Sequence, residues 1–265
     1  MNRTGLIVAL AIAAVVGVAF ALFPQLDLAL SQPFYDYVLL NYHFGWHIAQ
    51  PVMLARNIGL WISTILIAPF VAALVIKLVF PRRRLLLSGR AIVFLIATMA
   101  LGPGLLVNVA LKDHWGRPRP IDVTQFQGDQ HFVPWWDPRG DCPSNCSFVS
   151  GDVSGAFWTL APAALAPPQW RALAYAGALA LGAGMALLRM MAGAHFFTDV
   201  AFAGLFTFLI VWLVYAVIYR WPSTRLTDAA VERVLERIAT PGADFLAGLF
   251  GRKTKSPGAR PGDDR

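Results

Sequence analysis

The run GLIVALAIAAVVGVAFALF, residues 5–23, decides the class of fold. Roughly 20 apolar residues in a helix cross the roughly 30 Å hydrocarbon core of a bilayer, and this run has that length. It exceeds the apolar core of a usual secretory signal. The following FPQLD, residues 23–27, also lacks the small residues of a cleavage site. We therefore expect an uncleaved first transmembrane helix.

The rest of the chain repeats this pattern. Long apolar runs also occupy residues 58–80, 91–111, 152–167, 171–188 and 196–219. Of the 265 residues, 57% are hydrophobic and 14% are charged, which leaves too little polar surface for a soluble protein of this length. The runs follow one another too closely to be separate domains. We therefore predict an all-α bundle of six transmembrane helices in a single membrane domain, residues 1–222.

The placement of basic residues predicts the orientation, because short cytoplasmic loops are rich in Lys and Arg. Such residues occur in the second loop, in the fourth loop and after the last span: Arg82, Arg83, Arg84, Arg90, Arg171, Arg220 and Arg225. These loops and both termini are therefore expected in the cytoplasm, and the third loop, residues 112–151, outside. Topology signals and contact with anionic membrane lipids explain the net charge of +7, so we expect no nucleic-acid partner.

Residues 223–265 are expected to form a cytoplasmic segment outside the membrane domain. Val231, Val234, Leu235 and Ile238 recur at helical spacing among charged residues, which indicates an amphipathic helix on the membrane surface. From Gly251 onward, the Gly, Pro, Lys and Arg composition predicts a disordered tail. We assign this region no catalytic role.

The third loop carries basic residues on the side of the membrane where topology does not require them. Three segments with chemically active side chains lie at the outer ends of predicted spans. They are KDHWGRPRP (112–120), SFVSGDVSGAF (147–157) and LLRMMAGAHFFTD (187–199). Basic residues placed against the topology rule need another reason to be there, and the other residues of these segments indicate what it is.

The first feature of these segments is an anion site. Lys112, Arg119 and Arg189 supply positive charge, and arginine matches phosphate oxygens in bidentate geometry. Ser150 and Gly151 precede a helix, and the N-terminus of a helix favours an anion. Together these residues predict phosphate binding.

The second feature is a histidine with a carboxylate on the same helical face. His195 and Asp199 are four residues apart. A carboxylate bonded to one ring nitrogen fixes the tautomer and leaves the other nitrogen free to attack. A cationic site beside such a histidine predicts phosphoryl transfer, with no metal or other cofactor required.

The three segments resemble the signature of the type 2 phosphatidic acid phosphatase superfamily, K-x6-R-P, P-S-G-H and S-R-x5-H-x3-D. The matching residues are, in order, Lys112, Arg119 and Pro120; Ser150 and Gly151; and Arg189, His195 and Asp199. Three positions depart from it, because Val149, Asp152 and Leu188 stand where the motifs have proline, histidine and serine. The order of the motifs and the six-helix layout extend the resemblance from the first span to the last.

This resemblance implies a role for each matching residue. His195 would be the nucleophile that forms a phosphohistidine, Asp199 would orient it, and the other matching residues would bind phosphate. Arg117 is a possible auxiliary phosphate contact.

Asp152 has the place of the histidine that protonates the leaving group in the family. A free aspartic acid titrates at about 3.9 and is mostly ionised at neutral pH. Three interpretations stay open for Asp152: an acid tuned by burial, a group that orients a water or Arg117 for this task, and a sign of weakened catalysis.

The segment also resembles bacterial lipid A phosphatases, so we expect an enzyme of the bacterial inner membrane that cuts a lipid phosphate at the periplasmic face. We rank the 1-phosphate of lipid A first, because a sugar 1-phosphate leaves readily and needs little acid assistance. Phosphatidylglycerophosphate, undecaprenyl diphosphate, lipid phosphotransfer and a catalytically weak lipid-phosphate binder are the alternatives. A transporter is disfavoured, because the spans hold few ionisable residues apart from Arg56 and Lys77 near their ends.

Both cysteines of the chain, Cys142 and Cys146, lie in the third loop. A disulfide is favoured over two free thiols in an oxidising periplasm. His114 and His131 lie in the same loop, but their spacing does not support a metal site.

Overall fold

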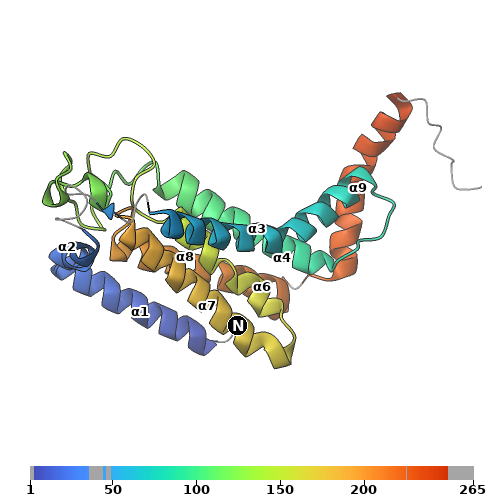
Figure 1. Ribbon diagram of the computed structural model, residues 1–265. Coiled ribbons are helices and arrows are strands. Elements are labelled where there is room, and N and C mark those ends of the chain that lie inside the picture. The colour runs from blue at the N-terminus through green and yellow to red at the C-terminus, as the bar shows by residue number, and fades with distance from the viewer. Residues whose placement is uncertain (1–2, 36–43, 46–48, 225, 250–265) are drawn as a thin grey trace, which may run out of the picture. The chain divides into compact units, whose positions relative to one another are not determined.

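The structure is a computed structural model that describes residues 3–35, 44–45, 49–224 and 226–249 (Figure 1). Within these ranges the chain forms helices joined by turns and loops. The described residues contain no strand, and a single isolated bridge joins Val123 to Gln130. The prediction of an all-α fold is confirmed.

In the part of the chain that the structure describes, five helical segments are long and apolar enough to cross a membrane. They are α1 (Arg3–Leu22), α3 (Gln50–Val79), α4 with the π-helix η3 (Gly89–Met99 and Ala100–Leu111), α7 (Pro168–Met191), and α8 with the π-helix η6 (Phe197–Tyr215 and Ala216–Arg220). The shorter elements are α2 (Gln25–Ser31), η1 (Gln32–Phe34), η4 (Pro120–Asp122) and η5 (Thr124–Phe126). A further long helix, α9 (Asp228–Leu249), has an amphipathic sequence and is not among the five. Five of the six predicted spans are therefore found as long helices.

The remaining predicted span, residues 152–167, forms two short helices instead. They are α5 (Gly151–Phe157) and α6 (Leu160–Leu165), and neither is long enough to cross a bilayer alone. Many side chains of this pair are buried, whereas the long helices expose large apolar side chains. The pair is therefore a core element of the protein.

Helix α5 packs tightly between α7 and α8. A Cβ atom added at Gly182 of α7 would lie 2.6 Å from the ring of Phe157, and one at Gly204 of α8 would lie 2.8 Å from it. Both glycines are thus needed for the close approach of α5. Because α5 begins at Gly151, this packing fixes the segment that carries Ser150 and Asp152.

The end of η3 is fixed against the same segment. The side-chain amide of Asn108 donates to the carbonyl of Pro103 at 2.7 Å, a carbonyl within the π-helical stretch. A Cβ atom at Gly151 would lie 2.7 Å from Oδ1 of Asn108, so a larger residue there would displace the Asn108 side chain. Lys112 follows directly after η3 and is thereby held close to the start of α5.

The chain divides into two compact units, residues 1–68 with 93–225 and residues 69–92 with 226–265. The three motif segments belong to the first unit. In the second unit, Glu232 of α9 accepts hydrogen bonds from Lys77 at 3.3 Å and from the Leu85 amide at 3.0 Å. The residues predicted to form an amphipathic helix lie within α9. The predicted disordered tail from Gly251 lies outside the described residues.

Candidate active site

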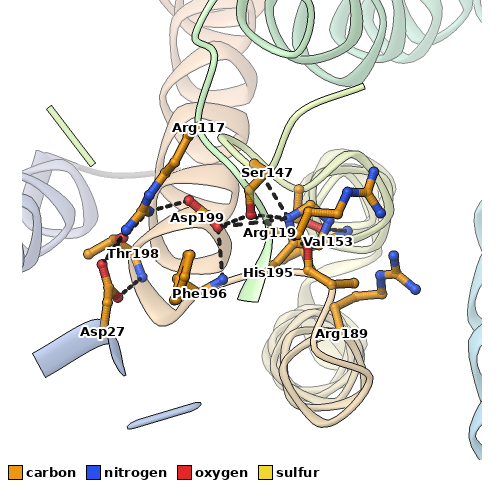
Figure 2. Close-up of polar contacts among 12 residues, drawn as sticks. Asp27, Arg117, Arg119, Ser147, Val153, Arg189, His195, Phe196, Thr198 and Asp199 are labelled. Carbon is orange, nitrogen blue, oxygen red and sulfur yellow. Dashed lines mark hydrogen bonds and ion pairs between the residues drawn. The ribbon is translucent and has the colours of Figure 1, made fainter. Parts of the chain in front are cut away.

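The three motif segments meet where several helices begin or end. Arg189 lies in the last turn of α7, His195 lies two residues before the start of α8, and Ser150 caps α5. Figure 2 shows Arg189 and His195 together with Arg119 and Asp199. Backbone hydrogen bonds join the segments: the Ile121 amide donates to Gly193 at 3.0 Å, and the Ser150 amide donates to Asp199 at 3.4 Å. Residues that are distant in sequence therefore share one site.

His195 is buried, and its ring is oriented by a backbone carbonyl. Nδ1 lies 2.8 Å from the carbonyl oxygen of Ser147, and the side chain is 2% exposed. Because a carbonyl can only accept a hydrogen bond, Nδ1 carries the proton and the lone pair remains on Nε2. This tautomer suits a nucleophile.

Asp199 acts on His195 less directly than the spacing predicted. Its Oδ2 lies 3.9 Å from Nδ1 of His195, beyond hydrogen-bond distance. The same oxygen accepts instead from the Ser147 hydroxyl at 2.5 Å and from the Phe196 amide at 2.8 Å. Asp199 thus holds Ser147, and Ser147 in turn holds the imidazole ring.

Three cations surround His195, and we call Lys112, Arg119 and Arg189 the cationic cluster. Burial and the positive charge of Arg189, Arg119 and Lys112 lower the pKa of His195 well below its usual value. Burial and the charge of Arg119 likewise lower the pKa of Lys112. His195 is therefore neutral at neutral pH beside a site that attracts anions.

Ser150 makes its hydrogen bonds to other residues of the protein. Its hydroxyl accepts from the Val153 amide at 3.5 Å and so caps the N-terminus of α5, and its side chain is fully buried. Asp152, the residue after Gly151, interacts electrostatically with Lys112. The start of α5 therefore lies next to the cationic cluster.

Asp152 lies between two arginines. Its Oδ2 is 2.7 Å from Nε of Arg56 and 3.3 Å from Nε of Arg189. Two guanidinium groups favour the ionised carboxylate. This environment does not favour the interpretation of Asp152 as a neutral acid, and Arg56 is a partner that the motifs did not identify.

Arg117 has a different environment from the one predicted. It has no exposed surface, and its guanidinium binds Asp27 at 2.7 Å and Asp199 at 2.5 Å. Thr198 belongs to the same network, because its hydroxyl donates a hydrogen bond to the carboxylate of Asp27 at 2.6 Å. In Figure 2, Asp27 and Arg117 lie on one side of His195, and Arg119 and Arg189 lie on the other. A role for Arg117 as an auxiliary phosphate contact is therefore replaced by a role in holding Asp199.

The third loop is closed by a disulfide between Cys142 and Cys146. Within this closed loop, the carbonyl of Asn145 accepts a hydrogen bond from Arg119 at 2.7 Å. The amide of Asn145 donates to Asp113 at 3.1 Å, one residue after Lys112. The disulfide loop therefore supports two members of the cationic cluster.

Reducing this disulfide should weaken substrate binding more than turnover. Loss of the closed loop frees Arg119 from the Asn145 carbonyl, so we expect KM to rise by about 3- to 10-fold, comparable to the loss of one ordinary intramolecular hydrogen bond. The measurement compares kinetics with and without dithiothreitol. The double variant Cys142→Ser/Cys146→Ser should match the reduced protein and be insensitive to the reductant; an unchanged KM in both would contradict this role.

The described residues hold no group of three His, Cys, Asp or Glu side chains that could bind a metal ion. The cationic cluster acts on His195 from nearby, and such positive charge suits an anionic ligand. Fold and site together define a helical membrane protein with a cationic site, suited to an anion, beside a neutral histidine.

Comparison with known proteins agrees with this class. The sequence profile of the PAP2 superfamily matches residues 90–223. The chain is 36% identical over 223 residues to the lipid A 4′-phosphatase of Francisella tularensis subsp. novicida, covering 83% of this chain and 98% of that protein. It is 39% identical over 115 residues to the lipid A 4′-phosphatase of Rhizobium leguminosarum, covering 43% of this chain and 49% of that protein. No solved structure matches.

The chain therefore belongs to the PAP2 superfamily, and it is a bacterial membrane lipid phosphatase that needs no metal ion. The predictions of the family and of phosphatase activity are confirmed. The transporter alternative is excluded.

Proposed function

We propose that this protein removes the 4′-phosphate of lipid A at the periplasmic face of the inner membrane. The sequence alone favoured the 1-phosphate. The similar proteins are named 4′-phosphatases, and one of them aligns over almost its whole length, which supports the 4′ position. The structural observation that carries the proposal is the neutral, buried His195 beside the cationic cluster of Lys112, Arg119 and Arg189.

The proposed reaction has two steps. Nε2 of His195 attacks phosphorus, the lipid oxygen departs, and water then hydrolyses the phosphohistidine. The phosphate oxygens are bound by Lys112, Arg119, Arg189 and the start of α5 at Gly151, which Ser150 holds in place as the cap of the helix. These groups are in place before the reaction and therefore stabilise the charge that develops on the phosphoryl group.

The topology is part of the proposal. We propose that residues 1–222 form the membrane phosphatase domain and that residues 223–265 and both termini are cytoplasmic. The arginine-rich second loop supports this orientation. The site also lies where η3 and α7 end and where α5 and α8 begin, as expected for segments that alternate in direction. A cysteine introduced near Arg139, tested with a membrane-impermeant thiol reagent in the Cys142→Ser/Cys146→Ser background, should react from the periplasmic side.

The experiment for the substrate uses purified protein and bisphosphorylated lipid A in detergent. Phosphorus NMR separates the signals of the two phosphates, so it reports which one is lost. We expect loss of the 4′ signal with release of inorganic phosphate. Loss of the 1-phosphate signal, or activity only on phosphatidylglycerophosphate or undecaprenyl diphosphate, would overturn the proposed substrate. Phosphate that appears on another lipid would identify a phosphotransferase.

The pH dependence of kcat/KM should report the environment of His195. Because burial and neighbouring cations lower its pKa, the imidazole stays neutral and active below about 6.5, the ordinary value. Activity is then lost only at lower pH, as the ring protonates. The substrate phosphate also ionises near pH 6, so its titration is followed separately by phosphorus NMR in the same detergent. An enzyme ionisation at or above about pH 6.5 on the acid limb would contradict the proposed environment.

A further inference from the structure

The carboxylate of Asp152 links the cationic cluster to a cation from a different helix. Arg189, a member of the cluster, lies 3.3 Å from Oδ2 of Asp152. Arg56 of α3 lies 2.7 Å from the same oxygen, and its charge acts on Arg189. Arg56 therefore lies at the edge of the phosphate site, although it belongs to none of the three motifs.

Arg56 is also free to contact a ligand. Its side chain is 37% exposed, whereas that of Arg189 is 13% exposed. Asp152 accepts from Nε of Arg56, and among the described residues no hydrogen bond engages the two terminal nitrogens of Arg56. The two terminal nitrogens of such a guanidinium can donate hydrogen bonds to a ligand oxygen while Nε keeps its bond to Asp152.

Asp152 itself is poorly suited to protonate a leaving group. An ionised carboxylate only accepts hydrogen bonds, and Arg56 and Arg189 both favour the ionised form. Arginine keeps its proton at any physiological pH, so Arg56 cannot act as the acid either. What Arg56 offers is a fixed positive charge close to the reacting phosphate.

We propose that Arg56 is a catalytic residue that stabilises the departing lipid oxygen, and that Asp152 positions Arg56 for this task. The inference rests on the proposed function. The pair would supply electrostatic stabilisation at the place where the resemblance implies a proton-donating histidine. Preorganised donors aimed at developing negative charge are among the largest contributions to catalysis.

The atoms and charges of this step balance. Nε2 of His195 forms the bond to phosphorus, and the bond from phosphorus to the lipid oxygen breaks, with its electron pair leaving on that oxygen. The alkoxide, paired with Arg56, takes a proton from water and leaves as the lipid alcohol. The resulting hydroxide attacks the phosphohistidine, which releases hydrogen phosphate and restores neutral His195.

The test varies the leaving group. Two substrates with the same alkyl tail are compared, an alkyl phosphate with a poorly leaving oxygen and an aryl phosphate with a readily leaving one. In Arg56→Gln, we expect kcat/KM for the alkyl phosphate to fall by about 10²-fold or more, the usual effect of removing one transition-state donor. The aryl phosphate needs less help and should fall by less than about 10-fold. Asp152→Asn should shift the ratio of the two substrates in the same direction.

The matched control is Ser63→Ala. The Ser63 hydroxyl donates to the Gly155 carbonyl at 2.9 Å, so it also joins α3 to α5 but carries no charge. This variant should leave the ratio between the two substrates unchanged. Arg56→Lys, which keeps the charge, should recover part of the lost alkyl activity.

Two outcomes would overturn the inference. An equal loss for both substrates in Arg56→Gln would show that Arg56 supports the phosphate or the fold, and no loss for either would show that it has no catalytic role. Either outcome can be interpreted only if the wild-type protein releases phosphate from the two substrates. Wild-type protein that hydrolyses neither them nor lipid A would instead overturn the proposed function.

Discussion

Replacing His195 by alanine should abolish phosphate release from lipid A. Its Nε2 is the only ring nitrogen with a free lone pair, because Nδ1 donates to the Ser147 carbonyl at 2.8 Å. Removing a nucleophile leaves only binding and electrostatic stabilisation, so we expect kcat to fall by roughly 10⁴-fold or more. The measurement is release of inorganic phosphate by purified protein in detergent.

A covalent intermediate gives this prediction a second readout. Wild-type protein quenched with alkali during turnover of radiolabelled lipid should retain label that is lost in acid, as expected for a phosphohistidine. His195→Ala and His195→Asn should retain none. His131→Ala is the control, because His131 lies in the third loop with an 84% exposed side chain. Label that persists in both His195 variants would assign the nucleophile to another residue.

Replacing Arg117 by methionine should give the largest loss of stability. Arg117 is the shared partner of the carboxylates of Asp27 and Asp199, and all three side chains are almost fully buried. Removing one partner of a buried ion pair typically costs about 3–5 kcal/mol, because a charge is left uncompensated. Thermal unfolding in detergent, followed by circular dichroism, should therefore shift to a clearly lower temperature.

The same network predicts an order among variants. Asp27→Asn leaves Arg117 paired with Asp199, so it should be less damaging than Arg117→Met. Arg139→Met is the matched control, because Arg139 lies in the same loop but pairs with Asp137 at an exposed position. An Arg117→Met protein as stable as this control would contradict a structural role for the buried network.

The sequence was informative wherever the chemistry lay within a short segment. Lys112 and Arg119 are separated by seven positions, and Arg189 and His195 by six, so their motifs could be recognised in the sequence. Their convergence around His195 agrees with what those motifs predict. Apolar runs of nearly twenty residues likewise identified the long helices, because the thickness of a bilayer sets their length.

The partners of these residues were not predictable in the same way. Thr198 bonds to Asp27 across 171 positions, and Arg56 bonds to Asp152 across 96. No local spacing links such pairs, since only the packing of the helices brings them together. Ser147 was missed for a different reason, because its contact with the His195 ring is made by the backbone carbonyl, which any residue type possesses. Its hydroxyl bonds to Asp199, which lies 52 positions away.

The sixth predicted span shows the limit of apolar patterning. Residues 152–167 are apolar because they are buried among protein side chains, and the segment breaks at Trp158 and Thr159. A buried helix and a lipid-facing helix have similar composition. Hydropathy therefore identified an apolar segment correctly but could not distinguish its surroundings.

The links made by Asp27 and Arg56 bear on how far this enzyme can be trimmed. The family profile begins at residue 90, yet both residues precede it. A truncated chain starting there would retain every motif residue but would leave Arg117 and Asp152 each without one counter-ion. We therefore expect the smallest catalytically competent unit to be larger than the region by which the family is recognised, because it includes α2 with Asp27 and α3 with Arg56.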